Sequence, residues 1–140
     1  MKRWRWVEMD VVKAIHDVQI AEHGGLAGIS NLDAIESALA RPMQLATYGH
    51  PDAAAIAAAY AWGIAAGHGF ADGNKRVAWL VARIFLADNG VAMIVDAADA
   101  VRTMWRVAAK SMTEDELAQW FRERIKPDRA QQRRGHETAS

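Results

Sequence analysis

Two consecutive apolar segments constrain the fold of this 140-residue chain more than any other feature. Residues 52–66 are rich in alanine and carry larger apolar side chains at helical spacing: Ile56, Tyr60 and Ile64. Residues 74–88 are apolar almost all round. A helix that is apolar on every side lies inside a domain, and many small side chains indicate a close approach between helices. The sequence therefore predicts two packed helices at the centre of an all-α domain.

The segment before this pair predicts two helices and a loop. A first helix is expected over residues 9–22, where three apolar residues share one face: Val11, Ile15 and Val18. A second helix is expected to start at Ser30 as its N-cap and to end at Pro42, because proline interrupts a helix. Residues 43–50 contain turn signals and are expected to form a loop or a short hairpin.

The segment after the pair predicts two more helices. Residues 91–95 are expected to be extended. Asp96 is expected to cap a fifth helix with one apolar stripe: Val101, Met104, Trp105, Ala108 and Met112. Thr113 and Glu116 form a capping box for a sixth. The expected architecture is one domain of about six helices over residues 1–126, followed by a flexible polar tail, residues 127–140, because Pro127 stops the last helix.

Composition excludes several classes of function. The chain has no cysteine, so disulfides, zinc–thiolate sites and a thiol nucleophile are ruled out. Its formal net charge is zero, and its basic C-terminal residues are interpreted as a solvated helix face and tail, so nucleic-acid binding is not expected. No secretory signal or membrane-spanning stretch is recognised, so a cytoplasmic protein is expected. His16 and His23 share a helix face without a third ligand and are interpreted as structural.

The chain has six tryptophans, which is a high number for its length. Trp62, Trp105 and Trp120 have apolar neighbours at helical spacing and are expected in the core. Trp4 and Trp6 alternate with arginines, a pattern that favours a short edge strand over an exposed patch for a partner.

The segment between the two central helices, HGFADGNKRVAW over residues 68–79, carries the chemistry. His68 is a candidate general base, and Asp72 is a candidate ligand for a divalent cation on a polyphosphate. The next helix opens with Gly73, Asn74, Lys75 and Arg76. The free N–H groups and positive dipole end of a helix start bind anions. The segment predicts a phosphoryl- or nucleotidyl-transfer site, although Asp-Gly-Asn is also an ordinary turn and cap sequence.

This segment resembles the signature of the Fic/Doc (Fido) family, and most closely its death-on-curing toxins, in which Asn-Lys-Arg replaces Asn-Gly-Arg. The similarity extends to residues 14–42 and 57–91 and covers about residues 5–125. It implies a compact Fic fold in which His68 deprotonates a hydroxyl of a target protein. It also implies that Asp72 holds Mg²⁺, that Phe70 anchors the loop, and that residues 43–51 take the place of a target-aligning flap. The residues expected to bind the nucleotide phosphates are Gly73, Asn74, Lys75 and Arg76.

Two positions depart from the adenylylating members of that family. Lys75 stands where they have glycine, and Trp79 stands where they have arginine. The death-on-curing toxins share both departures. The resemblance therefore implies transfer of the ATP γ-phosphate to a protein Ser or Thr, with a translation factor such as elongation factor Tu as the target. Adenylyl transfer at the same site and a binding module without catalysis are the alternatives, but a module that had lost catalysis would be expected to lack His68 or Asp72.

Many Fic enzymes inhibit themselves through a helix with the pattern Ser/Thr-x-x-x-Glu. No Ser or Thr in this chain has Glu four positions later; Ser111 comes closest, with Asp115. The resemblance therefore implies inhibition in trans by a cognate antitoxin, whose disordered segment folds on binding.

Overall fold

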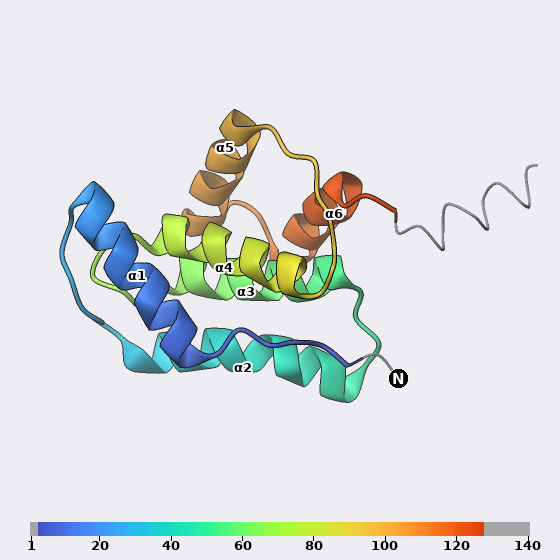
Figure 1. The fold of residues 1–140 in the computed structure, drawn as a ribbon, viewed down its shortest axis with the longest axis horizontal. Helices are drawn as coiled ribbons and strands as arrows, with labels where there is room; N and C mark the ends of the chain where they lie inside the picture. Colours follow the sequence, from blue (N-terminus) through green and yellow to red (C-terminus); the bar gives the residue numbers. More distant parts are fainter. Residues whose placement is uncertain (1–2, 128–140) are drawn as a thin grey trace, which may run out of the picture.

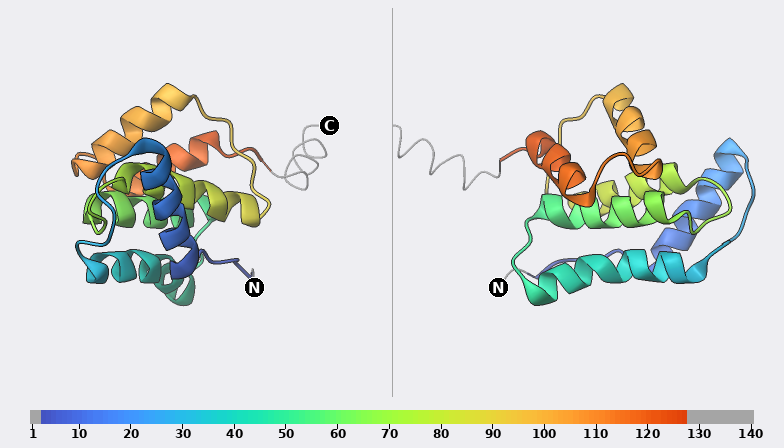
Figure 2. Two further views of the ribbon diagram at one scale, coloured as in Figure 1. Left: turned by 60° about the vertical axis from the view of Figure 1, so that its left-hand side comes forward. Right: turned by 180° about the vertical axis from the view of Figure 1, so that it is seen from behind.

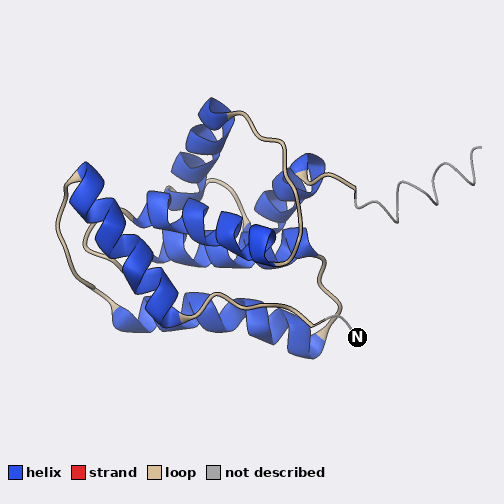
Figure 3. Ribbon diagram, viewed as in Figure 1, coloured by secondary structure: helices blue, strands red, loops and turns tan. Residues whose placement is uncertain are grey.

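The computed structural model describes residues 3–127, and within that range it contains six α-helices and no β-strand (Figure 3). The helices are α1 (Met9–His23), α2 (Leu32–Tyr48), α3 (Ala53–Gly67), α4 (Asn74–Asp88), α5 (Ala97–Ala108) and α6 (Glu114–Arg124). Helices α3 and α4 lie side by side, with α1 and α2 on one side of them and α5 and α6 on the other (Figure 1). The predicted all-α fold is confirmed. The predicted tail, residues 127–140, lies outside the described residues except for Pro127.

Helix α3 forms the centre of the core. Ten of its residues are buried, and it packs against α2, α4 and α6. Gly63 allows α2 to approach closely, because a Cβ at this position would lie 2.8 Å from the Cβ of Ala38. Tyr60 is fully buried against Phe85 of α4, with ring centroids 5.6 Å apart, and its hydroxyl accepts the Val7 N–H at 2.9 Å. Burial raises the pKa of Tyr60. The small side chains thus produce the close helix packing that the sequence predicted.

Helix α2 continues through Pro42 to Tyr48, so the prediction of a helix end, and of a loop or hairpin flap at residues 43–50, is wrong. Proline removes one helical hydrogen bond, which normally breaks a helix. Here Pro42 is itself buried, and α2 packs along α3, so tertiary contacts hold the interrupted helix together. The N-cap is Asn31 rather than Ser30, and its side chain accepts the Ala34 N–H at 3.2 Å.

The buried faces of α1 and α5 differ from the predicted ones. Val11 and Val18 are 44% and 51% exposed, and α1 instead buries Val12 and His16. On α5, Met104 is buried as predicted, but Val101 and Trp105 are exposed, and Thr103 and Val107 are buried in their place. Helix α1 packs on one side of the central pair and α5 packs on the other. Each of them therefore has a broad face that no other element covers (Figure 2).

The tryptophan predictions are confirmed in part. Trp120 is buried and Trp62 is half-buried, but Trp105 is 61% exposed, so its placement in the core was wrong. The expected edge strand at Trp4 and Trp6 does not form. Both indoles instead pack on Phe85, with centroid distances of 5.7 and 6.3 Å.

The remaining local predictions fit the structure. Asp96 caps α5 by accepting the Asp99 N–H, and Thr113 and Glu116 form the predicted capping box of α6. Residues 91–95 are extended, but they make a single bridge from Met93 to Ile125 instead of a strand.

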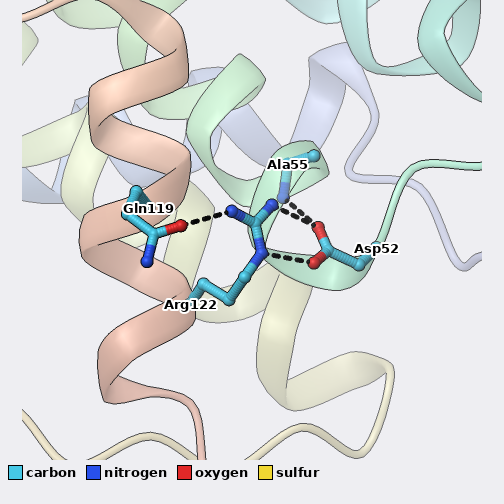
Figure 4. A network of polar contacts seen from close by, with 4 residues as sticks. All are labelled: Asp52, Ala55, Gln119 and Arg122. Carbon is cyan, nitrogen blue, oxygen red and sulfur yellow. Dashed lines mark hydrogen bonds and ion pairs between the residues drawn. The ribbon is translucent and has the colours of Figure 1, made fainter.

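Asp52 joins the start of α3 to α6 (Figure 4). Its carboxylate accepts the Ala55 N–H at 2.9 Å, and the Arg122 guanidinium donates to both of its oxygens at 2.7 and 3.0 Å. Arg122 also donates to Gln119 at 2.9 Å. The hydrogen bonds from Arg122, followed by that from Ala55, hold the pKa of Asp52 below its usual range despite partial burial.

This contact predicts a pH-dependent loss of stability in Asp52→Ala. At pH 7 the substitution should lower the free energy of unfolding by about 1 kcal/mol, mostly through the lost cap, because solvent screens the half-exposed ion pair. The folded-state pKa lies below the unfolded one, so the stabilisation is present above about pH 4 and is lost as the pH falls through the folded-state pKa. Urea denaturation at pH 7 and pH 3 measures this. Arg122→Ala keeps the cap and should therefore lose less unfolding free energy than Asp52→Ala. Equal urea midpoints for Asp52→Ala and wild type at pH 7 would contradict the stabilising role of Asp52.

Candidate functional site

Residues 68–73 form a tight loop between α3 and α4. Helix α3 ends at Gly67, and the next residue, His68, is its C-cap with a left-handed backbone, φ 49° and ψ 44°. Helix α4 begins after Gly73, which also has a positive φ, 81°. Asn74 closes the loop, because its Oδ1 accepts the Phe70 N–H at 2.9 Å and its Nδ2 donates to the Phe70 carbonyl at 3.0 Å. Asn74 opens the helix as expected, but its side chain holds the loop, and the cap position belongs to Gly73.

The loop between α1 and α2, residues 24–31, packs directly on this loop (Figure 2). The N–H groups of Ser30 and Asn31 donate to the Gly69 carbonyl at 2.8 and 2.9 Å, and the Ala71 N–H donates to the Gly28 carbonyl at 3.0 Å. Gly69 is buried and has no room for a side chain. The loop that carries the predicted site residues is therefore fixed by backbone contacts from a distant part of the chain.

Phe70 anchors the loop, as expected from the sequence. It is buried and stacks on His16 of α1, with ring centroids 4.0 Å apart. The His16 ring, also buried, contacts the Asp72 carbonyl through Nε2 at 2.9 Å, and Nε2 is the donor because a carbonyl only accepts. The structural interpretation of His16 is confirmed, but its contact with the loop was missed. The available signal was its position one turn after Val12, on the buried face.

His68 lies where α3, the loop and the end of α5 meet. Its ring is exposed, and Nε2 lies 3.0 Å from the Ala108 carbonyl. Because this carbonyl can only accept a hydrogen bond, Nε2 carries the proton in the neutral ring. The lone pair is then on Nδ1, which leaves Nδ1 able to accept a proton.

The Asp72 carboxylate is exposed but held in orientation. Its Oδ2 accepts the Leu26 N–H at 2.8 Å, while Oδ1 has no hydrogen-bond donor among residues 3–127. Gly25 lies so close that a Cβ there would be 3.1 Å from the Asp72 Cβ. No group of three or more His, Cys, Asp or Glu in the described part of the chain could hold a metal ion. A single carboxylate with a free oxygen is a ligand of the kind that Mg²⁺ uses when phosphate and water supply its other ligands.

The start of α4 has free N–H groups and cationic side chains, as the sequence predicted for a phosphate-binding helix start. The first helical hydrogen bond comes from the Val77 N–H to the Gly73 carbonyl at 3.0 Å. The N–H groups of Asn74, Lys75 and Arg76 precede it and have no acceptor within the described range. Arg76 is exposed and makes no ion pair there, and the Lys75 Nζ lies 4.3 Å from the centroid of the Trp105 ring. Three free N–H groups and two cations at a helix start favour a phosphate.

A pocket of about 660 Å³ lies beside the start of α4, between α4, α5 and residues 93–95. Gly73 and three cations line it: Lys75, Arg76 and Arg83. The apolar part includes Trp79, Met93, Val95, Val101, Met104 and Trp105. His68, Asp72 and Asn74 are not among its lining residues, so the predicted site residues divide between this pocket and the adjoining loop. The sequence did not predict the pocket, because helical periodicity placed Val101 and Trp105 in the core.

Fold and site together define an all-helical protein in which a short loop with a histidine leads into a helix start with free N–H groups and two cations. The family model for the Fic/DOC family matches residues 6–86. "Protein kinase doc" of Escherichia phage P1 is 35% identical over 88 residues, which are 62% of this chain and 70% of that protein. "Toxin Doc" of Mycolicibacterium smegmatis is 38% identical over 76 residues, 52% of this chain and 58% of that protein. This chain belongs to the Fic/Doc family, as the resemblance of its motif predicted.

Proposed function

We propose that this protein is the toxin of a toxin–antitoxin system and transfers the γ-phosphate of ATP to a Ser or Thr hydroxyl of a target protein. The observation that carries the proposal is the start of α4, with its free N–H groups and two cations, directly after the loop that carries His68 and Asp72. Its relatives, one named a protein kinase and the other a toxin, support it. The proposed target is a translation factor such as elongation factor Tu, whose modification blocks translation.

Each residue of the site has one part in the proposed reaction. His68 Nδ1 accepts the proton of the target hydroxyl as its oxygen bonds to the γ-phosphorus. The bond from that phosphorus to the β–γ bridging oxygen breaks, and ADP leaves with the bond's electrons. Gly73, the N–H groups from Asn74 to Arg76, and the Lys75 and Arg76 side chains hold the phosphates. Asp72 Oδ1 would hold Mg²⁺, which would supply positive charge to neutralise the phosphates.

Two residues support phosphoryl over adenylyl transfer. Lys75 adds a side chain and a charge at the helix start, where the adenylylating pattern has glycine. Trp79 packs against Trp120 and Phe121 at 5.9 and 6.1 Å, so it supplies an aromatic wall where that pattern has a phosphate-binding arginine.

A cognate antitoxin is the proposed inhibitor, acting in trans in the bacterial cytoplasm. The absence of Glu four positions after any Ser or Thr supports this regulation. None of the helices in residues 3–127 is long and apolar enough to cross a membrane. No direct contact with nucleic acid is proposed.

Label transfer tests the proposed reaction. The purified protein is incubated with a bacterial lysate, Mg²⁺ and ATP labelled at either the α- or the γ-phosphate. Label transferred only from the γ position, and only with Mg²⁺, is the expected result, and the labelled band identifies the target. Label from the α position would make the protein an adenylyltransferase, and no transfer from either position would overturn the proposal.

Gly25→Ala is expected to weaken metal binding through Asp72. A methyl group 3.1 Å from the Asp72 Cβ and 3.2 Å from Oδ2 must displace the carboxylate or break its bond with the Leu26 N–H. Displacing such a supporting contact should lower the affinity for Mn²⁺ in the presence of ADP about tenfold, as measured by electron paramagnetic resonance. Gly24→Ala is the matched control, because Gly24 also has a positive φ, 79°, but a Cβ there meets nothing within 4 Å. Equal Mn²⁺ affinities in the two variants would show that Gly25 does not position Asp72.

A further inference from the structure

Among the histidines of residues 3–127, His16 alone is buried. Its ring is 2% exposed and lies on Phe70, with the two ring planes inclined by 14°. Packing by itself would favour an apolar side chain at such a position, because burying a polar ring costs free energy unless the ring is hydrogen-bonded. The one hydrogen bond of His16 in this part of the chain runs from Nε2 to the Asp72 carbonyl at 2.9 Å, so the polar character of His16 serves the site loop.

The carbonyl that His16 contacts belongs to the peptide between Asp72 and Gly73. In a trans peptide the carbonyl and the N–H point in opposite directions. Because the Asp72 carbonyl is directed at α1, the Gly73 N–H points away from α1, and it has no acceptor within the described range. Gly73 is left-handed and Asn74 is helical, an alternation that turns successive N–H groups to one side and forms a concavity for anions. The Gly73 N–H is therefore one more free donor at the start of α4.

Gly73 also makes this arrangement easy to lose. A flip of the peptide plane changes only the Asp72 ψ and the Gly73 φ, and glycine accepts a φ of either sign. The flipped peptide would place the Asp72 carbonyl oxygen, with its partial negative charge, where the N–H now points, and it would repel a phosphate. The His16 ring supplies the one hydrogen bond that holds this carbonyl among the described residues.

We infer that His16 is a positioning residue of the proposed phosphate site: it locks the Asp72–Gly73 peptide with its carbonyl inward and its N–H free for a phosphate oxygen. The inference rests on the proposed function, because it takes the phosphates to lie at the start of α4. Phe70 takes part by stacking on the His16 ring, which fixes the plane in which Nε2 donates. The histidine is therefore needed for its N–H donor as well as for its apolar ring surface.

Calorimetric titration of the intact protein with tripolyphosphate, without metal, tests this role. His16→Phe keeps an aromatic ring for Phe70 but removes the donor, and its affinity should fall about tenfold, the loss of one charge-assisted hydrogen bond. His16→Gln should retain most of the affinity, because its amide nitrogen is as many bonds from Cβ as Nε2 is and can donate to the carbonyl. Val12→Ala is the matched control, since Val12 is buried on the same face of α1 and makes no hydrogen bond through its side chain. It should lower the urea midpoint and leave tripolyphosphate affinity unchanged.

The amide resonance of Gly73 gives a direct readout of the peptide orientation. In a proton–nitrogen correlation spectrum of the wild type, tripolyphosphate should move the Gly73 amide proton downfield, because this N–H becomes a donor to an anion. The shift should be lost in His16→Phe and kept in His16→Gln and in Val12→Ala.

Three results would overturn the inference: a wild-type Gly73 amide that tripolyphosphate does not shift, wild-type affinity in His16→Phe, or an equal loss of affinity in His16→Phe and Val12→Ala. The first needs no variant, so the test holds even if a substitution at His16 prevents folding. Each result can occur while label transfer from γ-labelled ATP proceeds, and the proposed function would then stand without this role of His16. Conversely, tripolyphosphate binding that depends on the His16 donor in a protein without transfer activity would support the positioning role and reject the proposed reaction.

Discussion

Replacing His68 with asparagine is expected to reduce phosphoryl transfer by about 10²- to 10⁴-fold, the contribution of a positioned general base. Asparagine is chosen because His68 has a left-handed backbone, which asparagine adopts more readily than alanine. The side chain is exposed, and its one hydrogen bond within residues 3–127 goes to the Ala108 carbonyl, so the fold should tolerate the change. Transfer from γ-labelled ATP to the target, beside a urea denaturation curve, measures both effects.

This prediction separates chemistry from binding. Because His68 does not line the pocket beside the start of α4, ADP should bind His68→Asn as it binds the wild type. Wild-type transfer by His68→Asn would show that Nδ1 is not the proton acceptor. Loss of ligand binding together with transfer would instead mean that His68 supports the loop.

Gly69→Ala is expected to have the largest effect on stability. A Cβ at Gly69 would lie 2.4 Å from Cγ1 of Ile35 and 3.1 Å from the Asn31 carbonyl oxygen. Ile35 is 1% exposed and packed in the core, so it has little room to move away. The variant should lose about 3 kcal/mol of unfolding free energy, as measured by urea denaturation, a typical cost of overpacking a fixed site. Its transfer activity should fall as well, because the shifted Gly69 carbonyl would lose the bonds that hold the loop.

Gly67→Ala provides the comparison, two residues away. Gly67 ends α3, and a Cβ there would lie 3.6 Å from the Ala34 Cβ, an ordinary contact. Its stability should stay within about 0.5 kcal/mol of wild type, because alanine suits a helical position. If the two variants unfolded at the same urea concentration, the close packing of the site loop against α2 would be wrong.

Features that depend on neighbours in sequence were predicted from sequence. The bounds of α4 and the caps at Asp96 and Thr113 agree with the structure, because a cap satisfies N–H groups only two or three residues away. The adjacency of His68, Asp72 and the start of α4 is local in the same sense, since a short loop between two helices must bring them together. The roles proposed for these residues stay predictions, which the experiments above test.

The contacts that orient the site join residues far apart in the chain. His16 reaches the Asp72 carbonyl across 56 positions, the Leu26 N–H reaches the Asp72 carboxylate across 46, and His68 reaches Ala108 across 40. A sequence pattern shows which groups can form hydrogen bonds but does not pair them. The tautomer of His68 and the free Oδ1 of Asp72 could therefore be assigned only from the tertiary structure.

Sequence by itself determined that this chain forms helices around an alanine-rich centre and that one loop with a histidine and a carboxylate leads directly into the start of a helix. Tertiary structure decided that α2 passes through Pro42, that α1 buries His16 instead of Val11, and that Trp105 faces a pocket. The physical reason is the same in each case. Periodicity and propensity describe one segment at a time, whereas the free energy of burial depends on how much of each face the other elements cover.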